Sequence, residues 1–304
     1  MPTSPETRKF ASDHAQKLLG QLAFEINRVA KSRDPESVHD LRVSLRRFSQ
    51  TLHLFEDCFP GRKIHKINLR VKRVMRSADE LRNFDTTLRL LSKARRSGSS
   101  ALRSKLQARR KESERLLAGL LKRWTERKSS VKWRTALQAA VEQSDGALAK
   151  IAIQQSARKI TLQLARKFLG KGKEAAASAS LNDIHACRMA ARRFRYALEL
   201  LGPVSNTALN AWLPDIKRLQ TMLGEITDFQ AARELISSYP VGDQFDTWLK
   251  KRQRKATNAF RQFWEETFAH RVVSVRKSRR QPKKPPGRIT ATSRPAIRKR
   301  VAVA

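Results

Sequence analysis

The stretch VHDLRVSLRRF at residues 38–48 is followed, 146 positions later, by IHACRMAARRF at residues 184–194. Both stretches read apolar-His-x-x-Arg-x-x-x-Arg-Arg-Phe. A second pair of blocks, VKRVMRSADELRNFD at 71–85 and IKRLQTMLGEITDFQ at 216–230, matches at an offset of 145. Because both blocks recur in the same order with nearly the same gap, the sequence predicts two copies of one helical unit related by pseudo-symmetry.

The rest of the chain also favours helices. Gly and Pro are scarce, at 11 each among 304 residues, and no segment alternates convincingly with period two over strand length. We therefore predict an all-α fold. Helices are expected at 7–30, 35–57, from 62 onward past a candidate break at 77–81, then at 102–127, 131–169, 181–203, 206–223, 225–238 and 241–268, with a linker at 170–180.

The net charge is +38, from 65 Lys and Arg residues against 27 acids. Residues 271–304 hold 12 of the basic residues and no acid, so 53 basic residues remain on the body and exceed the acids by 26. We expect a first helical half at 1–130, a second at 131–270 and a disordered basic tail at 271–304. Self-repulsion of this size favours a polyanionic partner.

Each repeated stretch places its basic residues beside its apolar face. On a helix, His185, Arg188, Arg192 and Arg195 form a stripe about 80° wide and about 15 Å long, which borders the apolar residues. In the first copy, Ser49 stands where the last arginine would be. Like charges at this spacing repel. Because the stripe borders the core, has few nearby acids and occurs twice, we interpret it as an anion-binding ladder.

A further stripe on the next helix carries Lys63, Lys66, Arg70 and Arg73. Arginine grips phosphate oxygens with a planar pair of donors, lysine adds point charge, and histidine gains charge beside an anion. Walls of such groups across a groove suit a repeating phosphate chain. Stripe residues Lys66 and Arg70 are therefore included among the predicted binding residues.

The two ladders and the blocks that follow them resemble the CHAD domain, a family named for conserved histidines on α-helices. The resemblance covers about residues 7–268. It implies two antiparallel four-helix-type bundles related by a pseudo-twofold axis, a basic groove between them, binding of inorganic polyphosphate and association with polyphosphate granules. The binding residues carried over are His39, Arg42, Arg46, Arg47, Lys72 and Arg73 in the first copy, and His185, Arg188, Arg192, Arg193, Arg195, Lys217 and Arg218 in the second. The first copy departs from the family at Ser77-Ala78-Asp79, where the second keeps the usual Leu223-Gly224 pair.

The main alternative is a nucleoid-type protein that binds DNA without sequence preference through its basic body and tail. Aromatic residues, at 7 %, are too few for a base-stacking surface. The tail is a candidate DNA-binding segment in either case.

We expect no catalysis, since hydrolysis of phosphoanhydrides normally needs carboxylates that hold Mg²⁺. The nearest carboxylates are interpreted as helix caps or braces: Asp79, Glu80, Asp85, Glu225 and Asp228. Neither a cofactor nor a metal ion is expected. With no apolar run of about 18 residues and no signal segment, a cytoplasmic protein is predicted, at polyphosphate granules or the nucleoid. The oligomeric state stays open.

Overall fold

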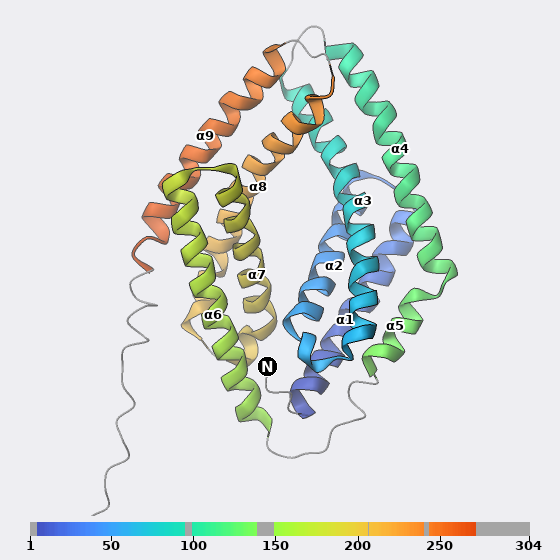
Figure 1. Ribbon diagram of the computed structural model, residues 1–304, viewed down its shortest axis with the longest axis vertical. Coiled ribbons are helices and arrows are strands. Elements are labelled where there is room, and N and C mark those ends of the chain that lie inside the picture. The colour runs from blue at the N-terminus through green and yellow to red at the C-terminus, as the bar shows by residue number, and fades with distance from the viewer. Residues whose placement is uncertain (1–4, 95–98, 139–148, 206, 240–242, 272–304) are drawn as a thin grey trace, which may run out of the picture.

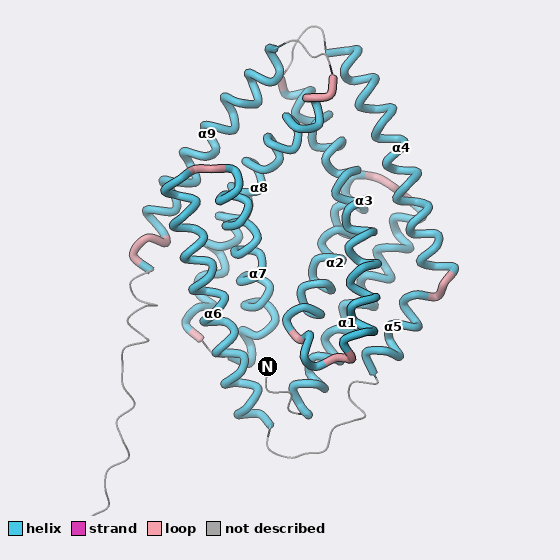
Figure 2. The backbone as a smooth tube through the Cα atoms, in the orientation of Figure 1, coloured by secondary structure: helices cyan, strands magenta, loops and turns pink. Residues whose placement is uncertain are grey.

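The computed structural model describes residues 5–94, 99–138, 149–205, 207–239 and 243–271. Every regular element in these ranges is helical, which confirms the all-α prediction (Figures 1 and 2). The first elements along the chain are α1 Pro5–Lys31, α2 Pro35–Leu54, η1 Glu56–Cys58, α3 Gly61–Lys93, α4 Ser99–Glu126 and α5 Ser129–Gln138. They are followed by α6 Ala149–Ser178, α7 Leu181–Ser205, η2 Ala208–Trp212, α8 Leu213–Ile236 and α9 Asp243–Thr267.

Three apolar cores hold these helices together. The first is built mainly from α1 to α5, with Leu200 and Leu201 of α7 at its margin. The second joins α6, α7, α8 and α9 around Phe168, Phe194 and Trp264. The third lies where the last turns of α3 and α8 meet α4 and α9, at the narrow end of the molecule in Figure 1. The pseudo-twofold relation of the halves and the boundaries at 130 and 270 stay predictions.

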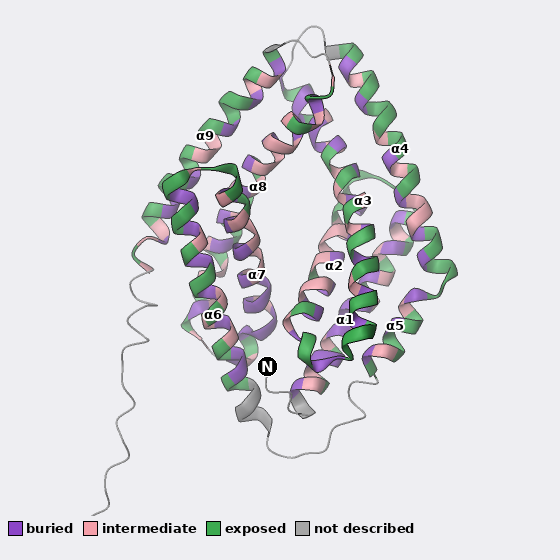
Figure 3. Cartoon of the chain, viewed as in Figure 1, coloured by how far each residue is buried: buried purple, intermediate pink, exposed green. Residues whose placement is uncertain are grey.

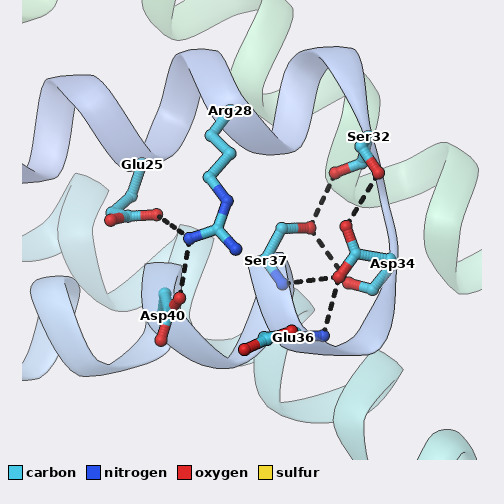
Figure 4. A network of polar contacts seen from close by, with 7 residues as sticks. All are labelled: Glu25, Arg28, Ser32, Asp34, Glu36, Ser37 and Asp40. Atoms are coloured by element: carbon cyan, nitrogen blue, oxygen red, sulfur yellow. Dashed lines mark hydrogen bonds and ion pairs between the residues drawn. The ribbon is translucent and has the colours of Figure 1, made fainter.

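The turn from α1 to α2 fixes the start of the first ladder. Asp34 accepts hydrogen bonds from the backbone amides of Glu36 and Ser37, both at 2.9 Å, and so caps α2 (Figure 4). Hydrogen bonds from Ser37 and Ser32 hold the pKa of Asp34 below its ordinary value. Arg28 of α1 donates to Asp40 at 2.7 Å, which ties α1 to the first turns of α2. His39 is therefore held on a fixed helix end.

Two predicted boundaries were wrong because glycine was interpreted as a breaker. The expected linker at 170–180 is helical as far as Ser178, and the turn is confined to Ala179, with φ of 51°, and Ser180. A Cβ at Gly172 would lie 1.9 Å from the indole of Trp264, so this glycine lets α9 pack closely on α6. Gly224 likewise lies inside one continuous helix, α8, and not between two.

Two other expectations were revised. The candidate break at 77–81 does not exist, since α3 runs unbroken from Gly61 to Lys93. Residues 139–148, expected within one helix at 131–169, lie outside the described residues, as does the tail from 272 onward. In the part of the chain that the structure describes, no helix is long and apolar enough to cross a membrane.

Candidate anion-binding site

The two ladders lie on α2 and α7, which face each other across the centre of the molecule (Figure 1). The apolar residues predicted to adjoin them are buried. On α2 these are Val38, Leu41, Leu45, Phe48 and Leu52, all at 0 % exposure. On α7 they are Ile184, Cys187, Ala191, Phe194 and Leu198, all at 1 % or less. Each helix is thereby anchored in its own half. In the adjoining basic stripes the arginines show intermediate exposure, whereas His39 and His185 are exposed. Intermediate residues predominate along α2 in Figure 3.

Four arginines from the two ladders form one group, which we call the central arginine cluster: Arg42, Arg46, Arg188 and Arg192. The pKa of Arg42 is lowered to about 10, chiefly by burial and then by the charge of Arg46. Burial also lowers the pKa of Arg192 to about 10, with contributions from Arg46 and Arg188. Because Arg46 belongs to α2 and Arg192 to α7, guanidinium groups of both copies lie close enough for their charges to act on one another.

One carboxylate partly offsets this charge. Asp79 of α3 accepts a hydrogen bond from Arg42 Nε at 2.7 Å and another from Arg46 Nη2 at 2.9 Å, both on its Oδ1 atom. The two arginine side chains are 11 % and 17 % exposed, whereas that of Asp79 is 39 % exposed. The carboxylate is thus the more accessible member of the group.

The arginines of the second ladder lack such a partner. Among the described residues, Arg188 and Arg192 form no ion pair within 4.0 Å. Arg192 places Nη2 2.8 Å from the sulfur of Met189, and its Nε is buried without an acceptor among the described protein atoms. A buried cationic donor without an acceptor favours the approach of an anion.

Among the acids, Asp228 of α8 raises the pKa of Arg188 most, against the larger effects of burial and of Arg46, which lower it. Burial raises the pKa of Asp228, against the opposing charges of Arg188, Arg82, Arg89 and Arg42. Arg89 Nη2 lies 4.0 Å from its Oδ2 atom. Arg82 and Arg89 were not among the binding residues predicted from the sequence. The sequence could have indicated them, because on a helical wheel of α3 both arginines lie within about 80° of Asp79, on the same face as the predicted Lys72.

The two histidines differ. His39 lies near Arg82, Arg42 and Arg46, and its pKa is lowered by burial first and by these charges second, while Asp40 raises it. His185, on the first turns of α7, is exposed, as is His39. Both therefore lie at the N-terminal ends of the ladders, and His39 is the one joined electrostatically to the cluster.

Three predicted ladder residues lie outside the central arginine cluster. Arg193 lines a cavity of about 350 Å³ between α2, α6 and α7, together with Lys167 and Tyr196. Arg47 lines a neighbouring cavity of about 320 Å³ with His14 and Lys17. Arg195 approaches Glu199 at 3.5 Å, and its guanidinium lies 4.8 Å from the ring centroid of Tyr196.

The binding residues predicted on α3 and α8 lie apart from the central arginine cluster. Arg70 and Arg73 line a small cavity of about 100 Å³ against α4, where Arg123 and Arg127 join them beside Trp124. Lys66, Lys72 and Lys217 are exposed. Arg218 lies over the ring of Phe263 on α9, 4.7 Å from its centroid. The structure thus gathers four of the predicted residues in the central arginine cluster and distributes the others around it.

Comparison with known proteins gives the family and the fold. A family model described as CHAD domain matches residues 13–237. The crystal structure of the CHAD domain from the plant Ricinus communis is similar to this chain, with a TM-score of 0.63, 18 % identity, and coverage of 89 % of this chain and 90 % of that one. PptA from Streptomyces chartreusis is also similar, with a TM-score of 0.58, 16 % identity, and coverage of 85 % and 99 %. No curated protein matches the sequence.

Proposed function

Because the chain belongs to the CHAD domain family, we propose that it binds inorganic polyphosphate through a groove between its two helical halves. The single observation that carries the proposal is the central arginine cluster, in which the charges of guanidinium groups from both ladders act on one another while only Arg42 and Arg46 hydrogen-bond to a carboxylate, that of Asp79. The remaining Lys, Arg and His residues of the ladders would extend this surface along the polymer.

The free protein carries buried, mutually repelling guanidinium groups in the central arginine cluster. Burial and mutual repulsion lower the pKa values of Arg42, Arg188 and Arg192, so the charged forms are destabilised relative to water. Phosphate groups would reverse both effects, since they supply opposite charge and bidentate acceptors. A polymer adds the release of condensed counterions, as in protein–nucleic acid binding. The site needs no base contacts, which favours a polymer of phosphate alone.

We further propose that the protein retains the polymer without cleaving it, and that it associates with polyphosphate granules in the cytoplasm. Asp79 and Asp85 are both engaged by arginines, Asp79 as described and Asp85 by Arg110 Nε at 2.6 Å. These carboxylates therefore brace helices in the free protein. Long-chain polyphosphate incubated with the protein and Mg²⁺ should keep its length on a gel.

Binding of duplex DNA is the second candidate, and the observation that favours it is the net charge of +38 with 12 basic residues at 271–304. Residues 272–304 lie outside the described residues. Deleting them should weaken DNA retention and leave polyphosphate affinity largely intact. Equal losses of affinity for DNA and for polyphosphate would contradict separate binding of DNA by the tail and of polyphosphate by the helical body.

The proposal is tested by titrating fluorescently labelled long-chain polyphosphate with the protein and with the double variant Arg188→Ala/Arg192→Ala. The double variant should lose at least about 100-fold in affinity, on the basis of about 1.5–3 kcal/mol for each hydrogen-bonded charged group. Lys250→Ala/Lys251→Ala, on exposed positions of α9, removes the same charge away from the ladders and serves as the control. Equal affinity of the two double variants would contradict a specific site.

A further inference from the structure

The two copies of the repeat place their aspartates differently next to the central arginine cluster. At the offset of 145, Asp79 of the first copy corresponds to Gly224 of the second. One helical turn later the second copy carries the aspartate instead, because Asn83 of the first copy corresponds to Asp228 of the second. Each copy therefore carries one aspartate on this stretch of helix, but in a different place.

At its position on α3, Asp79 contacts two arginines of the first ladder. Its Oδ1 atom accepts from Arg42 Nε at 2.7 Å and from Arg46 Nη2 at 2.9 Å. These are the donors that a phosphate oxygen would use, and the geometry of one oxygen between two guanidinium groups is that of a bound anion. In the second copy, Gly224 presents no side chain, and Arg188 and Arg192 form no ion pair among the described residues.

We propose that Asp79 acts as an internal anion that competes with phosphate groups for Arg42 and Arg46, and so limits the affinity of the protein for polyphosphate. This inference rests on the proposed function. The second ladder, on which Asp228 and Asp79 act only through longer-range charge, binds the polymer without breaking an ion pair of Arg188 or Arg192 among the described residues, whereas the first ladder exchanges Asp79 for phosphate. Asp79 is accordingly a residue that determines affinity and does not itself bind the polymer.

The accessibility of Asp79 makes this exchange feasible. Its side chain is 39 % exposed, while Arg42 and Arg46 are 11 % and 17 % exposed, so the carboxylate lies on the solvent side of the pair. A phosphate arriving from solvent meets the carboxylate first and is repelled by it at short range. In the free protein the same carboxylate reduces repulsion within the central arginine cluster. Removing its charge should therefore affect stability and affinity in opposite directions.

Two reciprocal variants test the inference. Asp79→Asn removes the charge and keeps the shape, and should tighten the binding of labelled polyphosphate about five- to tenfold, in proportion to a charge-assisted contact that is no longer displaced. The same variant should unfold at a lower temperature without polymer. Gly224→Asp places a carboxylate at the corresponding position of α8, where a Cβ meets no atom within 4 Å. It should weaken binding by a similar factor.

Asp246→Asn provides the matched control. Asp246 is 32 % exposed and binds two cations, Arg233 Nε at 2.7 Å and Lys250 Nζ at 2.8 Å, between α8 and α9 and away from the ladders. The variant Asp246→Asn changes the net charge by the same amount as Asp79→Asn. Any gain in polyphosphate affinity that the two variants share therefore reflects long-range charge alone.

The outcomes separate the two proposals. Tighter binding by Asp79→Asn than by Asp246→Asn, with weaker binding by Gly224→Asp, supports the inference. If the wild type binds polyphosphate and Arg188→Ala/Arg192→Ala abolishes that binding, but Asp79→Asn binds equally or less tightly than the control, Asp79 only positions the arginines and the inference is wrong. A wild type that does not bind polyphosphate would overturn both.

Discussion

Arg46 on α2 lies close enough to Arg188 on α7 for its charge to lower the pKa of Arg188. The two residues come from different copies of the repeat. Their proximity makes the centre of the molecule a place where an anion removes a repulsion that the free protein carries. Several measurable consequences depend on this arrangement.

The structure separates Arg70 and Arg73 from the central arginine cluster, and the two sets should differ in their effect. Arg70→Ala/Arg73→Ala removes two charges that line the cavity beside α4. We expect it to weaken polyphosphate binding less than about tenfold, the effect of exposed charges, compared with the far larger loss for Arg188→Ala/Arg192→Ala. Dissociation constants at one salt concentration provide the comparison. Equal losses would mean that the polymer also crosses the surface between α3 and α4.

Affinity should fall steeply with salt. If about eight phosphates are neutralised, the logarithm of the binding constant should change with the logarithm of salt concentration with a slope near −6, using the single-strand value of about 0.7 for each contact. Arg188→Ala/Arg192→Ala should reduce the magnitude of this slope by about 1.4. Titrations at four salt concentrations measure both slopes. A slope near zero would exclude counterion release as the driving force.

Lowering the pH from 7.5 to 5.5 should tighten binding. Because burial, Arg82 and Arg42 lower the pKa of His39, the side chain is neutral in the free protein at pH 7. A bound polyanion favours the protonated form, so binding takes up a proton and affinity rises as the pH falls. His39→Gln/His185→Gln should lose most of this response. The histidines have no such role if the double variant and the wild type respond alike.

The close packing of α6 on α9 gives a prediction about stability. Gly172→Ala would drive a methyl group into the indole of Trp264, which is 1 % exposed, and should lower the free energy of unfolding by about 1–3 kcal/mol. Gly170→Ala, two residues earlier in the same helix, meets no atom within 4 Å and should be neutral or slightly stabilising. Urea unfolding of the two variants measures the difference, and equal stabilities would show that Trp264 can move aside.

The sequence was sufficient for the fold class, the repeat and the faces of the ladder helices. The period of apolar residues in 38–52 and 184–198 decides which side chains are buried, and those predicted for the core are buried. Helix boundaries were less predictable. Gly172 and Gly224 look like breakers in the sequence, but the reason for Gly172 is the indole of Trp264, 92 residues further along the chain.

The site was predictable one helix at a time, but its assembly was not. The ladder spacing identifies Arg42, Arg46, Arg188 and Arg192, and the structure brings these four together. The interpretation of Asp79 as a brace was correct, since it binds two ladder arginines, but the helix wheel of α3 alone could not show which residues it braces. The placement of Arg70 and Arg73 beside α4 depends on tertiary packing for the same reason.

The measurement that tests the central claim most directly is competition between two phosphate polymers. Labelled long-chain polyphosphate is bound to the full chain at about 0.15 M salt and challenged with duplex DNA at matched phosphate concentration. We predict that polyphosphate resists displacement and that Arg188→Ala/Arg192→Ala abolishes its binding. Displacement by DNA at equal phosphate concentration would contradict this account, because the ladders would then be a generic basic surface.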